Sequence, residues 1–148
     1  MPKASVKRNI NKKKDKLIEF VLDIEKYPEF IPFCLGSKVY DRKEDINQIL
    51  IIADLTIGKG PFSDTYKSDV RFNKKDDTIN VTNLEGPLKH LQNNWKFVEN
   101  NGMTEVYFDV DFEIKNKFLN ILMTTSFQYG LDKIADAFQK RANQLFKR

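Results

Sequence analysis

The stretch "VYFDVDFEI", residues 106–114, decides the fold because its side chains alternate in character without a break. One set is apolar: Val106, Phe108, Val110, Phe112 and Ile114. The residues between them are polar or acidic: Tyr107, Asp109, Asp111 and Glu113. Successive side chains of a strand point to opposite faces. The pattern therefore predicts a β-strand with one face on a core and the other in solvent.

Downstream of residues 115–116, the apolar period lengthens to that of a helix for about thirty residues. Its apolar positions step by three or four: Phe127, Leu131, Ile134, Phe138, Ala142 and Leu145. This spacing predicts one long amphipathic helix with a single apolar stripe. No other expected element is large enough to cover the apolar face of a sheet.

Upstream, the period of two residues recurs between turn signals. Strands are expected at residues 4–10, 38–42, 46–57, 62–72, 78–84 and 91–98. The "ENNG" turn at residues 99–102 joins the last of these to the 106–114 strand as a hairpin. Short turns of this kind predict an antiparallel sheet. A helix is expected at residues 13–24, with Asn11 as a candidate N-cap.

Residues 25–39, "EKYPEFIPFCLGSKV", are unusually apolar for a connection. Tyr27 precedes a proline, which disfavours helical backbone and ends the first helix. Pro28 then suits the first turn of a second, short helix that runs to about Phe33. If Phe30 and Phe33 face outward they suggest a docking surface, and if they face inward they line the interior.

These elements predict an α+β fold of the helix-grip type in a single domain, residues 1–148. A seven-stranded antiparallel curved sheet surrounds the long C-terminal helix, and two short helices lie between strands 1 and 2. Such a sheet is roughly 30 Å wide, whereas one helix is about 10–12 Å wide. Large side chains must fill the remaining space, or a cavity remains. Gly130 could leave room for a ligand, allow close packing on a strand, or face solvent.

The charge of the chain is divided between its ends and its body. Residues 1–16 carry seven basic groups against one acid, residues 137–148 carry four basic groups and no acid, and the body is net negative. Basic ends can contact phosphates on a membrane or on RNA, although lysines also simply solvate a helix. The candidate contacts are Lys12, Lys13, Lys14 and Lys16.

The sequence lacks the groups that most enzyme classes need. A single cysteine, Cys34, and a single histidine, His90, exclude a disulfide framework and the usual zinc sites. No glycine-rich phosphate loop, secretory signal or membrane-spanning run is present. We therefore expect a cytoplasmic, non-catalytic binding protein, peripheral to the inner membrane if its basic ends dock there.

Four segments together resemble the coenzyme Q-binding protein and ribosome association toxin family, a branch of the START-like, polyketide cyclase-like (SRPBCC) superfamily. They are "YPEFIPFC" with "GSKV" (residues 27–39), "ADLTIGKGPFSDTYKSDV" (53–70), "LEGPLKHLQNNWKF" (84–97) and "IADAFQKRA" (134–142). Their order matches over nearly the whole chain. Leu88 departs from the aromatic residue that usually follows the Gly-Pro of the family.

The resemblance implies an apolar tunnel between the sheet and the long helix, and ubiquinone or another isoprenoid lipid as its occupant, in support of respiration. No cofactor is required beyond such a lipid. Tyr27 and Phe30 would form a lid or face a membrane. The expected lining residues are Phe33, Leu55, Phe62, Tyr66, Trp95, Phe108, Phe112, Phe127 and Leu131.

Two other functions stay open at this stage. The first is a regulator that binds the large ribosomal subunit through the basic termini. The second is a cyclase or aromatase, for which Asp64, Tyr66 and Ser68 are the only polar candidates inside a cavity. The sequence does not name the lipid or the oligomeric state.

Overall fold

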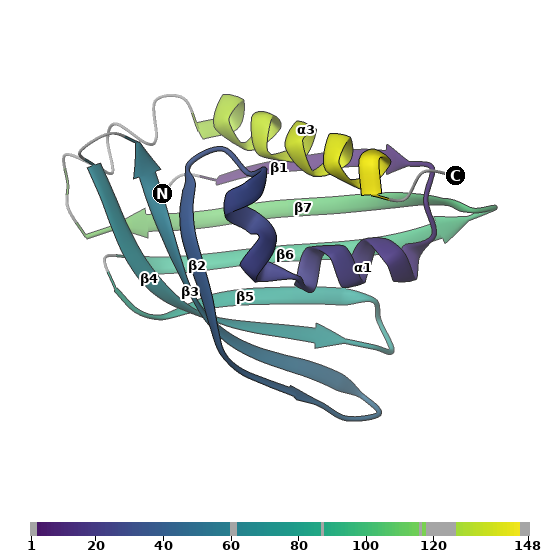
Figure 1. Ribbon diagram of the computed structural model, residues 1–148, viewed down its shortest axis with the longest axis horizontal. Coiled ribbons are helices and arrows are strands. Elements are labelled where there is room, and N and C mark those ends of the chain that lie inside the picture. Colours follow the sequence, from purple (N-terminus) through teal and green to yellow (C-terminus); the bar gives the residue numbers. More distant parts are fainter. Residues whose placement is uncertain (1–2, 60–61, 87, 116, 118–126, 146–148) are drawn as a thin grey trace.

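The helix-grip arrangement is confirmed by the computed structural model, which describes residues 3–59, 62–86, 88–115, 117 and 127–145 (Figure 1). Seven strands form one antiparallel sheet in the order β1-β7-β6-β5-β4-β3-β2. The strands are β1 (Lys3–Ile10), β2 (Cys34–Glu44), β3 (Gln48–Lys59), β4 (Phe62–Asn73), β5 (Thr78–Glu85), β6 (Leu88–Asn100) and β7 (Met103–Ile114). The helices are α1 (Lys14–Leu22), the 3-10 helix η1 (Ile24–Glu29) and α3 (Phe127–Leu145).

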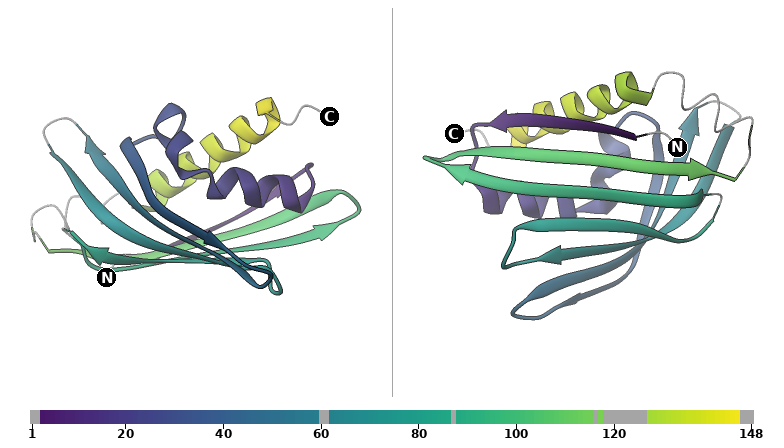
Figure 2. Two further views of the ribbon diagram at one scale, coloured as in Figure 1. Left: turned by 60° about the horizontal axis from the view of Figure 1, so that its bottom comes forward. Right: turned by 180° about the vertical axis from the view of Figure 1, so that it is seen from behind.

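The sheet is curved, and α1, η1 and α3 lie on its concave side (Figure 2). Interruptions of the strand register at Cys34/Gly36, Val39/Asp41, Lys67/Ser68 and Leu88/His90 accompany this curvature. Such bulges bend a strand and increase its twist, so long strands can coil around a helix. α3 runs along β1 and β7, and α1 and η1 lie beside its C-terminal half (Figure 1).

Strand β7 contains residues 106–114, and its buried and exposed side chains alternate as the sequence predicts. Within β7, Val106 and Phe112 are buried, whereas Tyr107 and Asp109 are exposed. The hairpin before it is also confirmed, because Asn101 and Gly102 both have positive φ angles, 54° and 80°. Positive φ at both central residues is the requirement of a tight hairpin turn.

Two details of the N-terminal helices differ from expectation. α1 begins at Lys14, after Lys13 in the N-cap position, so Asn11 is not its cap. The second helix does not start at Pro28; it is η1, a 3-10 helix with Pro28 near its end. Pro28 lacks an N–H donor, and the backbone leaves the helix at Phe30, whose N–H donates to the carbonyl of Tyr27 at 3.2 Å.

Several strands begin at other residues than predicted, because the alternation of side chains does not show where the backbone pairing of two strands begins or ends. β2 begins at Cys34, four residues before the predicted start, and β6 begins at Leu88 rather than at Leu91. Ile46 belongs to the turn before β3 and is 88% exposed. The predicted helical period between residues 117 and 127 lies largely outside the described residues.

The apolar stripe of α3 faces the sheet over most of its length. Leu131, Phe138 and Ala142 are buried, but Leu145 at the end of the stripe is 52% exposed. None of the described helices is both long and apolar enough to cross a lipid bilayer.

Gly130 lies within α3, and no described atom comes within 4 Å of a Cβ atom built on it. Close packing on a strand is therefore not its role. Gly130→Ala is expected to raise the free energy of unfolding by about 0.5–1 kcal/mol, because alanine loses less backbone entropy in a helix. Thermal denaturation of the two proteins tests this, and a lower melting temperature for the variant would contradict it.

Candidate functional site

One end of the concave face is filled by a cluster of aromatic rings centred on Phe138 of α3. Ring centroids of four residues lie 5.2–5.6 Å from that of Phe138: Phe20, Tyr27, Phe30 and Trp95. They come from α1, η1, the η1–β2 connection and β6, so the cluster joins α1, η1 and α3 to the sheet. Tyr27 also donates a hydrogen bond from its hydroxyl to the carbonyl of Val21.

Little space remains at this packed end. A void of about 30 Å³ lies between α3 and strands β1, β6 and β7, which is the volume of roughly one water molecule. Its walls include Val6, Val106 and Phe108. A ligand of lipid size cannot lie here without displacing the aromatic cluster.

The other end of the concave face, which we call the open end, is only half-buried. It comprises Cys34 of β2, Leu55 and Ile57 of β3 and Tyr66 of β4. The strand register places these residues on the same face as the buried core, since Leu55 pairs with Tyr66 two positions beyond the fully buried pair Ala53 and Ser68. Half-buried apolar side chains on a concave surface are the usual lining of a lipid site.

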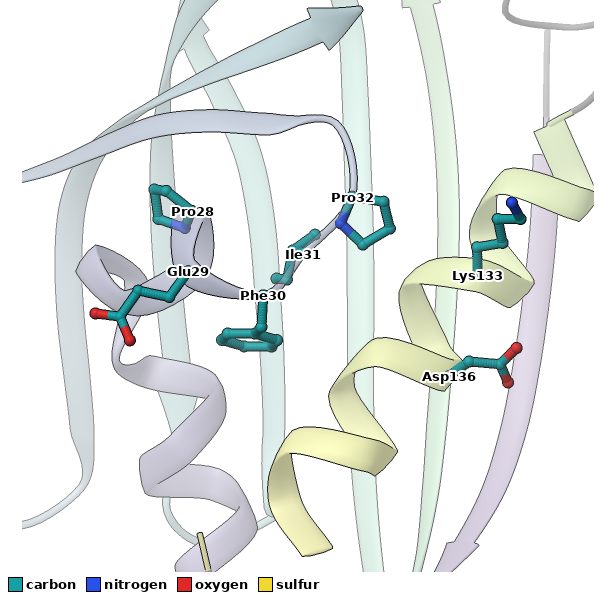
Figure 3. Close-up of a pocket in the computed structure, with 7 residues that line it drawn as sticks. All are labelled: Pro28, Glu29, Phe30, Ile31, Pro32, Lys133 and Asp136. Atoms are coloured by element: carbon teal, nitrogen blue, oxygen red, sulfur yellow. The ribbon is translucent and has the colours of Figure 1, made fainter. Parts of the chain in front are cut away.

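A shallow groove of about 540 Å³, open to solvent, lies between the η1–β2 connection and α3. One wall is the segment from Pro28 to Pro32, and the other carries Lys133 and Asp136 of α3. Figure 3 shows the ring of Phe30 in the space between η1 and α3. The groove is mostly apolar on the η1 side and charged on the α3 side.

Two ion pairs tie α3 to its neighbours around the groove. Arg141 bonds Glu29 at 2.6 Å and lies 5.3 Å from the ring centre of Phe30, and Arg8 of β1 bonds Asp136 at 2.5 Å. Sequence reasoning counted both arginines among the basic termini and missed these contacts, because pairing partners more than a hundred residues apart leave no local pattern.

The aromatic side chains of residues 27–33 do not all point in the same direction. Tyr27 and Phe30 both turn toward Phe138, while each stays half-buried and Phe30 also lines the groove. Phe33 remains 38% exposed and has a positive φ angle of 70°, which is strained for a bulky residue.

The other expected lining residues fall into three groups. Leu55, Tyr66 and Phe108 are half-buried on the concave side. Trp95, Phe112 and Leu131 are buried in the core. The side chains of Phe62 and Phe127 lie outside what the structure describes.

The lysines proposed to contact phosphates are not equivalent. Lys14 lies 2.8 Å from Asp77, which holds the pKa of the lysine above its ordinary value through a hydrogen bond. Lys13 is exposed and Lys12 is half-buried, while Lys16 lies exposed on α1. The ion pair with Asp77 makes Lys14 less available to an anionic partner.

No catalytic pair is formed by the sole cysteine and the sole histidine. Cys34 lies on β2 and His90 on β6, with three strands between them, roughly 19 Å at normal strand spacing. The His90 imidazole instead lies 3.7 Å from the Asp111 carboxylate. Of the polar candidates for a cyclase, the Ser68 hydroxyl donates to the carbonyl of Ala53, and Asp64 is exposed.

Burial raises the pKa of the Cys34 thiol. The thiolate is the reactive form, so at pH 8 the folded protein should be alkylated by iodoacetamide more slowly than the unfolded chain. Mass spectrometry of timed samples in buffer and in urea measures the two rates. Equal rates would contradict the placement of Cys34 in the open end.

The curved sheet, the long C-terminal helix and the half-buried concave face define a START-like protein of the helix-grip class. The chain belongs to the polyketide cyclase / dehydrase and lipid transport family, whose model matches residues 11–139.

Two kinds of relative are similar over most of the chain. The ribosome association toxin RatA of Rickettsia prowazekii is 29% identical over 91% of this chain and 92% of its own length. The mitochondrial coenzyme Q-binding protein COQ10 of Dictyostelium discoideum is 32% identical over 85% of this chain and 62% of its own length.

Solved structures share the same fold. The 18 kDa protein CC1736 of Caulobacter crescentus is 28% identical, with a TM-score of 0.79 and 98% of each chain covered. The Zhui aromatase/cyclase of Streptomyces is only 12% identical, with a TM-score of 0.78 over 98% of this chain and 96% of its own, which shows the fold alone.

Proposed function

We propose that the protein is a non-catalytic carrier that binds an isoprenoid quinone or a similar prenyl lipid between the open end and α3, in support of respiratory electron transport. The single observation that carries the proposal is the half-buried apolar surface of Leu55 and Ile57 on the concave side of β3. No cofactor other than this lipid is needed, and the exposed lysines would favour docking at an anionic inner-membrane surface.

The energetics of such a site require no catalytic group. Burial of each methylene contributes about 0.8 kcal/mol, so a few isoprene units give substantial affinity. The name of the COQ10 relative supports a quinone as the occupant. Tyr66 is the only candidate polar group left for a cyclase, which disfavours an enzyme.

Titration with decylubiquinone tests the proposal in solution. Leu55→Asn should weaken binding about tenfold or more, because it places a polar group against the apolar ligand. Leu84→Asn is the matched control, since Leu84 is 50% exposed on β5, and it should change affinity less than about twofold. Absence of binding by the wild-type protein, or equal losses in both variants, would reject the proposal.

A ribosome-binding regulator is the second candidate, because the RatA relative matches nine-tenths of its own length. Phosphate contacts predict strong dependence on salt. Sedimentation with ribosomal subunits at about 50 mM and about 200 mM salt separates the alternatives. Cosedimentation that is lost at the higher salt, and lost in a variant with Lys12, Lys13 and Lys16 replaced by glutamine, supports this candidate, whereas no cosedimentation at the lower salt rejects it.

A further inference from the structure

Tyr66 stands out within the open end because it carries a hydroxyl on an otherwise apolar surface. It lies on β4, opposite Leu55 of β3, and packs against the hydrophobic core while remaining half-buried. Its neighbours of the open end on β3 are Leu55 and Ile57, which offer a ligand no hydrogen bond from their side chains.

Two neighbouring polar side chains on this side of the sheet are already hydrogen-bonded within the protein. Ser68 donates to the carbonyl of Ala53 at 3.1 Å. Asn83 donates to the carbonyl of Leu88 and accepts from the backbone N–H of Leu91, both at 3.0 Å. In contrast, the Tyr66 hydroxyl has no hydrogen-bond partner among the residues that the structure describes.

A ligand that covers this hydroxyl must supply a hydrogen-bond partner, because an unpaired buried hydroxyl is costly. Burial raises the pKa of Tyr66 well above its ordinary value, so the phenol keeps its proton and acts as a donor at physiological pH. The Cys34 thiol lies close enough to interact with it electrostatically, but Cys34 is itself a weak donor directed to the carbonyl of Gly36 at 3.7 Å.

The backbone of Tyr66 is held in place by the β5–β6 connection. A Cβ atom on Gly86 would lie 2.8 Å from the Tyr66 Cα atom, closer than side chains pack. The glycine therefore allows a contact that fixes where the ring of Tyr66 leaves the strand. A fixed donor is what orients a ligand in a largely apolar site.

From this geometry we propose that Tyr66 donates a hydrogen bond to an oxygen acceptor at one end of the bound apolar molecule. The ligand class is then a hydrophobic chain with a carbonyl-bearing head, such as a benzoquinone, rather than a plain hydrocarbon. This inference rests on the proposed carrier function and assigns the position of the head group within it.

Tyr66→Phe removes only the hydroxyl and keeps the ring. We expect the variant to bind decylubiquinone about tenfold more weakly than the wild type, the equivalent of one hydrogen bond to a buried acceptor. Decylbenzene, which has no acceptor, should bind both proteins equally. Tyr40→Phe is the matched control, because Tyr40 is 50% exposed on β2 and its hydroxyl bonds Asp54.

Titration calorimetry with both probes gives the affinities, and the infrared carbonyl stretch of bound decylubiquinone reports the hydrogen bond directly. The stretch should move to higher frequency in Tyr66→Phe but not in Tyr40→Phe. Equal affinity of wild type and Tyr66→Phe for decylubiquinone, or the same loss for both probes, would overturn the role of Tyr66 while leaving the carrier function intact. Failure of the wild type to bind either probe would instead reject the carrier function.

Discussion

Replacing Phe138 with alanine is expected to lower the free energy of unfolding by about 3–5 kcal/mol. Phe138 is 7% exposed and forms ring contacts with residues of α1, η1, the η1–β2 connection and β6. Its removal would leave a cavity at the point where α1, η1 and α3 meet the sheet. Chemical denaturation in urea, followed by circular dichroism, measures the change.

Leu145→Ala is the matched control for this substitution. Leu145 belongs to the same predicted stripe of α3 but is 52% exposed, so its truncation should cost less than about 1 kcal/mol. Comparable losses in the two variants would mean that the aromatic cluster does not hold α3 against the sheet.

The second large effect is expected at Gly86, which has a φ angle of 128°. A Cβ atom there would approach the Tyr66 Cα atom to 2.8 Å and the Thr65 carbonyl oxygen to 3.0 Å. Both neighbours are backbone atoms of a central strand and cannot move aside cheaply. Gly86→Ala should therefore cost about 2–4 kcal/mol in stability, and it should also weaken quinone binding by displacing Tyr66.

Gly102→Ala separates backbone strain from this close contact. Gly102, at the β6–β7 hairpin, also has a positive φ angle, 80°, but no described atom lies within 4 Å of where its Cβ atom would be. Its replacement should cost about 1 kcal/mol. Thermal melting of both variants measures the two losses of stability. Equal decreases in melting temperature would show that the close contact with Tyr66 adds no cost to that of the positive φ angle.

Much of the fold could be predicted because its elements are long and strongly patterned. Each pattern predicts a single buried face, and the structure confirms both. The first is the alternation of residues 106–114, and the second is the apolar stripe from Leu131 to Ala142. Helix ends were less predictable. The end of α1 and the position of η1 depend on 3-10 hydrogen bonds around Tyr27, and a proline is compatible with several such arrangements.

The candidate site was less accessible to sequence reasoning than the fold. Apolar periodicity places Trp95, Phe108 and Leu55 on one face, but it does not show that a cluster around Phe138 fills one end and leaves the other half-buried. The contact of Arg141 with Glu29 and Phe30 joins residues far apart in the chain, and only the three-dimensional structure brings them together.

The carrier function is tested most directly by the lipid content of the protein itself. The native protein, purified without detergent, is extracted with organic solvent, and the extract is analysed by mass spectrometry beside a sample incubated with ubiquinone. We predict an isoprenoid quinone or related prenyl lipid in the extract, with an increased amount after incubation. Absence of prenyl lipid from the native extract, together with no uptake of added ubiquinone, would contradict the account.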